Sequence, residues 1–257
     1  MKFTVFIIIF CFTLVGYSYS NHSYAQNLEI DASEFLEWDQ NAMSYIAKGD
    51  AVAKQGDRLI NADKIIAYYE DKDSRDITRI EAIGNVSFID EDRTGAGAKM
   101  VYNMIDKSLG LTGEKVSYKS EKITANSSKS ILYQENDGVI TLESNVIIAL
   151  TGDNNSQTIS AEFVKILLDD DGQVSIINAN NNVKLAEDNG RIAYSDSAIY
   201  NAVSGTTDLE GSVEIYDGQN LLRGDKANIN MVTGYSKIIA EGANQRVSGK
   251  LILGTSN

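Results

Sequence analysis

The chain has 257 residues, a formal net charge of −13, no Pro, one Cys and one His. An acidic chain without a basic run is a poor partner for nucleic acid, because phosphate contacts depend on Lys and Arg. A single thiol and a single imidazole also exclude a disulfide framework and most nucleophile–base pairs.

The first 25 residues are typical of a secretory signal peptide. Lys2 precedes the apolar run 3–15, and Ser23-Tyr24-Ala25 offers small residues where a signal peptidase cleaves. We expect cleavage after Ala25 and export, leaving residues 26–257 as one elongated repeat domain. A retained N-terminal anchor is the alternative, although the apolar run is short for a membrane span.

Cleavage would remove the only Cys, Cys11, and the only His, His22. The mature chain would then lack a thiol nucleophile, an imidazole base and an imidazole metal ligand. We therefore predict no catalytic residue, no cofactor and no metal site. Packing and hydrogen bonding alone would stabilise the fold, which a chain of this length can achieve.

A strand pattern with a central Gly or Asn recurs along the mature chain. Its clearest copy reads IEAIGNVSF, and its central positions are residues 49, 84, 113, 144, 181, 211 and 242, which suggests about seven repeats. A second box, small-Asp-Lys or a variant of it, follows after a polar turn at 61–66, 97–103, 128–133, 196–201 and 224–230. Repeats of this kind are a signature of stacked supersecondary units.

Period-2 alternation predicts strands, and short polar turns predict that neighbouring strands pair antiparallel. We expect an all-β fold in which the repeats stack into one long sheet. Residues 33–46 and 161–168 could be helical on propensity, but the repeat register favours strands. The central Gly or Asn indicates a bend that would crease the sheet into an apolar trough.

The acidic run Asp169-Asp170-Asp171-Gly172 offers clustered oxygens that could hold Ca²⁺. The EF-hand spacing and its distal Glu are missing. A solvated hairpin turn is therefore the favoured interpretation.

Three phrases together carry a family resemblance: the run 30–37, the run 47–56, and Ile60-Asn61-Ala62-Asp63-Lys64. With the boxes above they resemble the OstA-like family, in particular its LptA branch. The resemblance implies an elongated, curled antiparallel sheet, V-shaped in section and called a β-jelly roll. It also implies a periplasmic protein that binds lipopolysaccharide and bridges inner- and outer-membrane transport complexes. An LptC-like protein or the N-terminal domain of an LptD-like protein is the alternative within the same pathway.

A trough that carries acyl chains would use the inward parity of the strands, because burying hydrocarbon is worth roughly 0.8 kcal/mol per CH₂. The same residues could instead form an ordinary closed core. On the outward parity, Glu81, Glu143, Lys184 and Glu214 should be solvated, and the acidic surface suits anionic head groups that stay in water. The candidate lipid-binding residues are Ile80, Val86, Phe88, Met100, Tyr102, Leu142, Val146, Ile148, Val183, Leu185, Val213 and Ile215.

The sheet should end in open edges that can add strands from another chain. We expect the first strand within Asn27–Trp38 and the last near Val247–Leu253. The resemblance implies that these edges join LptC-like and LptD-like partners and further copies of the chain, head to tail.

Two other functions compete with lipid transport. A β-solenoid carbohydrate-active enzyme could use paired carboxylates, which are plentiful, but no acidic pair stands with aromatic and basic residues. A structural surface repeat is the third hypothesis, for which the repeat number is small.

Overall fold

The structure is a computed structural model that describes residues 28–71, 73, 75–151, 156–241 and 245–252. The predicted signal peptide and the repeat centre at 242 lie outside these residues. Every regular element in the described part is a strand. The strands are β1 Glu29–Asp31, β2 Phe35–Asp39, β3 Ser44–Gln55, β4 Arg58–Tyr69, β5 Ile77–Asp90, β6 Arg93–Asn103, β7 Ser108–Thr112, β8 Val116–Lys119, β9 Ile123–Ser127, β10 Ser130–Gln134, β11 Val139–Leu150, β12 Gln157–Leu168, β13 Val174–Glu187, β14 Ile192–Asn201, β15 Thr206–Asp217, β16 Asn220–Asn230, β17 Ser236–Ile239 and β18 Ser248–Lys250.

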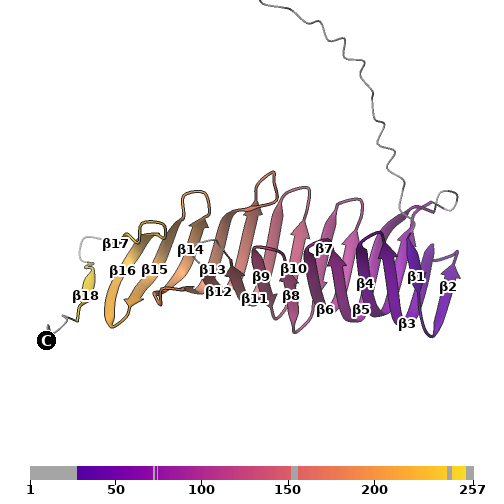
Figure 1. The fold of residues 1–257 in the computed structure, drawn as a ribbon, viewed down its shortest axis with the longest axis horizontal. Helices are drawn as coiled ribbons and strands as arrows, with labels where there is room; N and C mark the ends of the chain where they lie inside the picture. The colour runs from indigo at the N-terminus through magenta and orange to yellow at the C-terminus, as the bar shows by residue number, and fades with distance from the viewer. Residues whose placement is uncertain (1–27, 72, 74, 152–155, 242–244, 253–257) are drawn as a thin grey trace, which may run out of the picture.

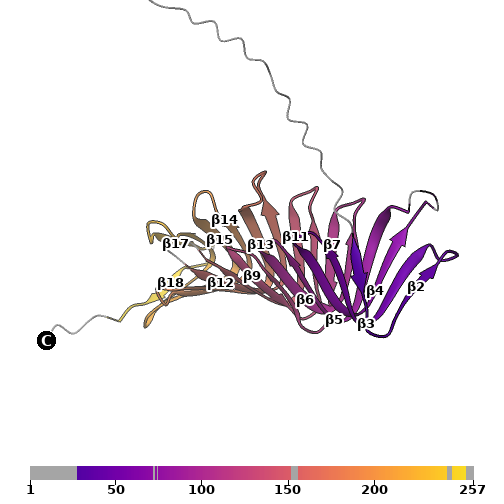
Figure 2. The same ribbon diagram turned by 45° about the vertical axis from the view of Figure 1, so that its right-hand side comes forward.

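All eighteen strands belong to one antiparallel sheet, which confirms the predicted fold class. They lie across the long axis of the molecule, from β2 at the indigo end to β18 at the yellow end (Figures 1 and 2). The helical alternative for 161–168 is wrong, because these residues lie in β12. The alternative for 33–46 is wrong as well, since β2 and the start of β3 occupy this range. Tertiary pairing overrides local helix propensity in both places.

Each long odd-numbered strand bends at its central Gly or Asn, as predicted. Two consecutive residues with positive φ stand there: 49/50, 84/85, 144/145, 181/182 and 211/212. The pairing register shifts at the same points, so that in β5 Gly84 and Asn85 lie opposite the single residue Ala98 of β6. An extra residue in one strand increases the local bend, and these aligned bulges form a corner along the sheet.

The corner divides the sheet into two walls. Each long strand thus has two arms, one on either side of the corner. The arms of the first wall pair with β2, β7, β10 and β17, and the arms of the second wall pair with β1, β8, β9 and β18. The repeat centre at 113 differs from the others, because the chain there breaks into the separate strands β7 and β8. The predicted first strand is likewise two strands, β1 and β2, which pair with different arms of β3.

The core lies between the two walls and runs through the sheet from β3 to β16. It consists of Ile, Leu, Val, Ala, Met and aromatic side chains from the inward parity of both walls, with Ala47 near one end and Ile229 near the other. Leu142, Ile148, Val164 and Ile166 have no exposed surface. The walls therefore pack directly on one another.

Candidate functional site: the interior and its mouth

Eleven of the twelve residues predicted to line the trough are buried in this core. The twelfth, Tyr102, is half-buried and packs against it. The inward parity was therefore assigned correctly at every one of these positions. The structure brings them together as one continuous apolar interior, which is filled by its own side chains.

The outward residues behave as predicted with one difference. Lys184 is exposed, and Glu143 and Glu214 are partly exposed. Glu81 also points outward, but its side chain is only 13% exposed because Arg79 and Lys99 each place a nitrogen 3.1 Å from its carboxylate. The outer face thus carries cross-strand ion pairs, which shelter some of its charges.

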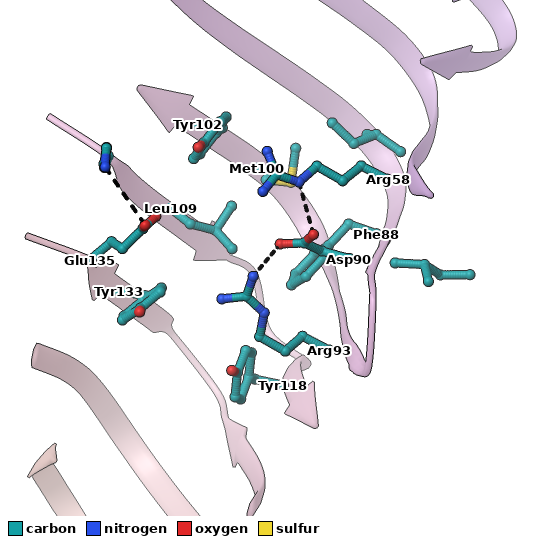
Figure 3. Close-up of a pocket in the computed structure, with 13 residues that line it drawn as sticks. Arg58, Phe88, Asp90, Arg93, Met100, Tyr102, Leu109, Tyr118, Tyr133 and Glu135 are labelled. Carbon is teal, nitrogen blue, oxygen red and sulfur yellow. Dashed lines mark hydrogen bonds and ion pairs between the residues drawn. The ribbon is translucent and has the colours of Figure 1, made fainter. Parts of the chain in front are cut away.

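A pocket opens at the mouth, where the tips of the two walls face each other in the N-terminal half (Figure 3). We call it the mouth pocket. Its floor includes the core residues Phe88 and Met100, so that it leads into the apolar interior. It is lined by Arg58, Ile60, Phe88, Ile89, Asp90, Arg93, Met100, Tyr102, Lys107, Leu109, Tyr118, Tyr133 and Glu135.

Charged side chains form both lips of this pocket. On the second wall, Asp90 accepts a hydrogen bond from Arg58 Nε at 2.9 Å and another from Arg93 Nη2 at 2.5 Å. The hydrogen bond that Arg58 donates to Asp90 raises the pKa of Arg58. On the first wall, Lys107 Nζ lies 4.0 Å from Glu135 Oε1. Through its hydrogen bonds to Arg58 and Arg93, the Asp90 carboxylate therefore joins the two turns of the second wall at this point, β3–β4 and β5–β6.

Three tyrosines line the pocket: Tyr102 and Tyr133 on the first wall, and Tyr118 on the second wall, level with Phe88. Burial raises the pKa values of Tyr102, Tyr118 and Tyr133, since an apolar surrounding disfavours the phenolate. The phenols therefore remain neutral across the physiological pH range and can both donate and accept hydrogen bonds.

Farther along, the mouth is closed by Arg191 in the β13–β14 turn at the tip of the second wall. Arg191 is nine-tenths buried and pairs with Glu187 through two hydrogen bonds of 2.9 and 2.7 Å. Its Nη1 crosses to the first wall, where it donates to Ser236 Oγ at 3.0 Å and to the Gly234 carbonyl at 3.3 Å. We call this contact the Arg191 clasp.

The acidic run at 169–172 is a hairpin turn in the structure. Asp169 Oδ1 accepts hydrogen bonds from the backbone N–H groups of Asp171 and Gln173 at 3.1 and 2.8 Å. Across the described ranges, no group of three His, Cys, Asp or Glu side chains is arranged to hold a metal ion. No helix in the described part is long and apolar enough to cross a membrane.

The alternating pattern does not reveal the charged lips, because Arg58, Arg93 and Lys107 stand at turns or strand ends, outside that pattern. A usable signal was present in the Tyr that ends several second boxes, as at Tyr102 and Tyr133. In the structure these two tyrosines lie at the tip of the first wall, where the interior opens.

The fold and the mouth define a class: elongated, curled antiparallel sheets with a continuous apolar interior between two walls. Comparison with known families gives one match, described as "LptA/(LptD N-terminal domain) LPS transport protein", over residues 29–137 and 122–235. The chain belongs to this family, as its sequence motifs indicated.

A solved structure also matches, titled "Crystal structure of LptH, the LptA homologous periplasmic component of the conserved lipopolysaccharide transport device from Pseudomonas aeruginosa". The two chains are 13% identical with a TM-score of 0.43, and the match covers 49% of this chain and 96% of LptH. No curated protein matches the chain.

Proposed function

We propose that this protein is a periplasmic carrier of lipopolysaccharide that holds the acyl chains of lipid A between its walls and performs no chemistry. The observation that carries the proposal is the unbroken apolar interior, which runs from β3 to β16. Membership of a lipopolysaccharide-transport family supports the class of cargo.

The walls must part to admit acyl chains, because residues such as Leu142 and Ile148 are already fully buried. The acyl chains would replace contacts between the walls, so that the apolar surface stays out of water. The same apolar residues would thus form the core of the protein without cargo and the binding site for the acyl chains with cargo.

Site-specific photo-crosslinking tests this function. A photoreactive residue at Phe88 or Ile148 should label lipopolysaccharide, because both side chains lie on the inner face. The same residue at Glu143 is the matched control, since Glu143 lies on the same strand as Ile148 and on the outer face. Glu81 is a second control, although its ion pairs shelter it. Equal labelling from both faces would contradict an interior site.

We further propose that the two ends of the sheet bind other proteins by strand addition: LptC-like and LptD-like partners, and copies of the same chain. β1 and β2 pair with β3 alone among the described strands, and β17 and β18 pair with β16 alone. Exposed apolar side chains gather at these edges, including Phe35, Leu36 and Trp38 at one end and Leu251 and Ile252 at the other.

The family description covers LptA and the N-terminal domain of LptD alike, so an LptD-type or LptC-type role in the same pathway is the alternative. Depletion tests the shared pathway. Loss of the protein should stop newly made lipopolysaccharide from reaching the outer membrane, and normal delivery would contradict transport.

A further inference from the structure

The mouth pocket carries more cationic than anionic side chains. Three cationic side chains, Arg58, Arg93 and Lys107, and two carboxylates, Asp90 and Glu135, line it. The pocket therefore carries a positive surplus on a chain whose formal net charge is −13. A surplus of this sign beside an apolar opening is a feature of sites that receive an anion.

The lip on the second wall offers more hydrogen-bond donors than its carboxylate, Asp90, accepts. Asp90 accepts one hydrogen bond from Arg58 Nε and one from Arg93 Nη2, whereas each guanidinium has five N–H groups. A single arginine would suffice to pair Asp90 and hold the β5–β6 turn. Because Asp90 orients both guanidinium groups at one lip, it presents them together toward the pocket (Figure 3).

The apolar part of the pocket begins directly below these donors. Phe88 is two residues from Asp90 on the same strand, and Phe88 and Met100 are both members of the buried core. Tyr102 and Tyr133 line the pocket from the first wall. Tyr118, itself a member of the buried core, lies level with Phe88 on the second wall, since Gly95 is the register partner of both. The pocket thus brings cationic, neutral polar and apolar side chains together.

We propose that the mouth pocket is a head-group site that binds a phosphate ester of an acylated glycolipid. The phosphate would accept hydrogen bonds from Arg58 and Arg93, whose planar forks suit phosphate oxygens. The sugar would lie against the tyrosines, and the acyl chain would pass Phe88 and Met100 into the core. This inference rests on the proposed function, and it modifies the expectation that all anionic head groups stay in free water.

Equilibrium binding to two lipids tests the proposal. The probes are lipid A that carries its phosphates and the same lipid after enzymatic removal of them, each in the same detergent. The wild-type chain should bind the phosphorylated form about tenfold to a hundredfold more tightly, as charged hydrogen bonds at this site imply. The double variant Arg58→Gln, Arg93→Gln should lose this preference and keep its affinity for the dephosphorylated lipid.

The single variant Arg58→Gln should lose part of the preference, and Arg223→Gln is its matched control. Arg223 donates through Nε to Glu214 at 2.6 Å, and its side chain is 54% exposed against 55% for Arg58, but it lies outside the mouth pocket. The control should keep the wild-type preference. Binding of the dephosphorylated lipid also shows that each variant is folded.

Three outcomes would overturn the head-group site. An unchanged preference in the double variant would place the phosphate elsewhere. An equal loss in Arg223→Gln and in the single variant Arg58→Gln would reduce the effect to net charge. Displacement of the lipid by inorganic phosphate at equal concentration would assign the pocket to a free anion. If the wild-type chain binds neither lipid, the proposed function itself fails.

Discussion

At the scale of single residues, the two recurring sequence boxes meet at the corner. The Asp of the second box lies against the Gly of the first: a Cβ placed on Gly84 would lie 2.1 Å from Asp63 Oδ2, and Gly211 stands in the same relation to Asp196. Asn85 Nδ2 also donates to both carboxylate oxygens of Asp63, at 3.0 and 3.1 Å. The pairing explains why both boxes recur together.

Gly84→Ala should therefore destabilise the protein through two separate effects. Ala at φ +77° costs about 1 kcal/mol, and displacing Asp63 from Asn85 costs about 1 kcal/mol more. Gly172→Ala is the control, because Gly172 has φ +73° and nothing within 4 Å of an added Cβ. Denaturant unfolding followed by circular dichroism compares the two. Equal losses would show that the Asp63 contact contributes nothing.

Period-2 alternation was enough to predict which residues of a strand face inward, as Val146 and Ile148 or Val213 and Ile215 illustrate. It could not predict the mouth, because Arg58 reaches Asp90 through the relative positions of two hairpin turns. Contacts between side chains 32 residues apart leave no periodic trace in the sequence.

At the scale of elements, the Arg191 clasp joins the β13–β14 turn to the β16–β17 turn. Arg191→Ala would leave the carboxylate of Glu187, whose side chain is 10% exposed, without its cation. An uncompensated charge of this kind costs about 3 kcal/mol. The loss should appear as a lower midpoint in denaturant unfolding.

Arg223→Ala provides the comparison, since it breaks an exposed ion pair of 2.6 Å and should therefore cost far less stability than Arg191→Ala. Adding Glu187→Gln to Arg191→Ala should recover part of the loss, because the orphaned charge is then removed. If the two arginine variants were equally stable, the clasp would not hold the walls together.

At the scale of the whole molecule, the family match falls twice on the chain, yet the sheet is continuous across both matched segments. β7 pairs with β10 and β10 with β11, so the hydrogen-bonded ladder continues through residues 122–137, where the two segments overlap. We propose on this ground that residues 26–257 form a single domain. The sequence predicted the long sheet but left open whether its interior is an open trough or a closed core, because that depends on how side chains of two walls fill the space between them.

The length of this sheet gives its ends particular weight, because they are where the described strands leave edges unpaired. Leu36→Asp should weaken concentration-dependent self-association in sedimentation experiments, since Leu36 is 60% exposed on β2 at the N-terminal end. A charge on an edge strand opposes the addition of another strand. Val203→Asp is the matched control, because Val203 is 88% exposed in the β14–β15 turn, away from the N-terminal end. Deleting residues 27–37 should have a larger effect than Leu36→Asp, because it removes β1 and the start of β2. Unchanged association after this deletion would show that copies of the chain do not meet through this edge.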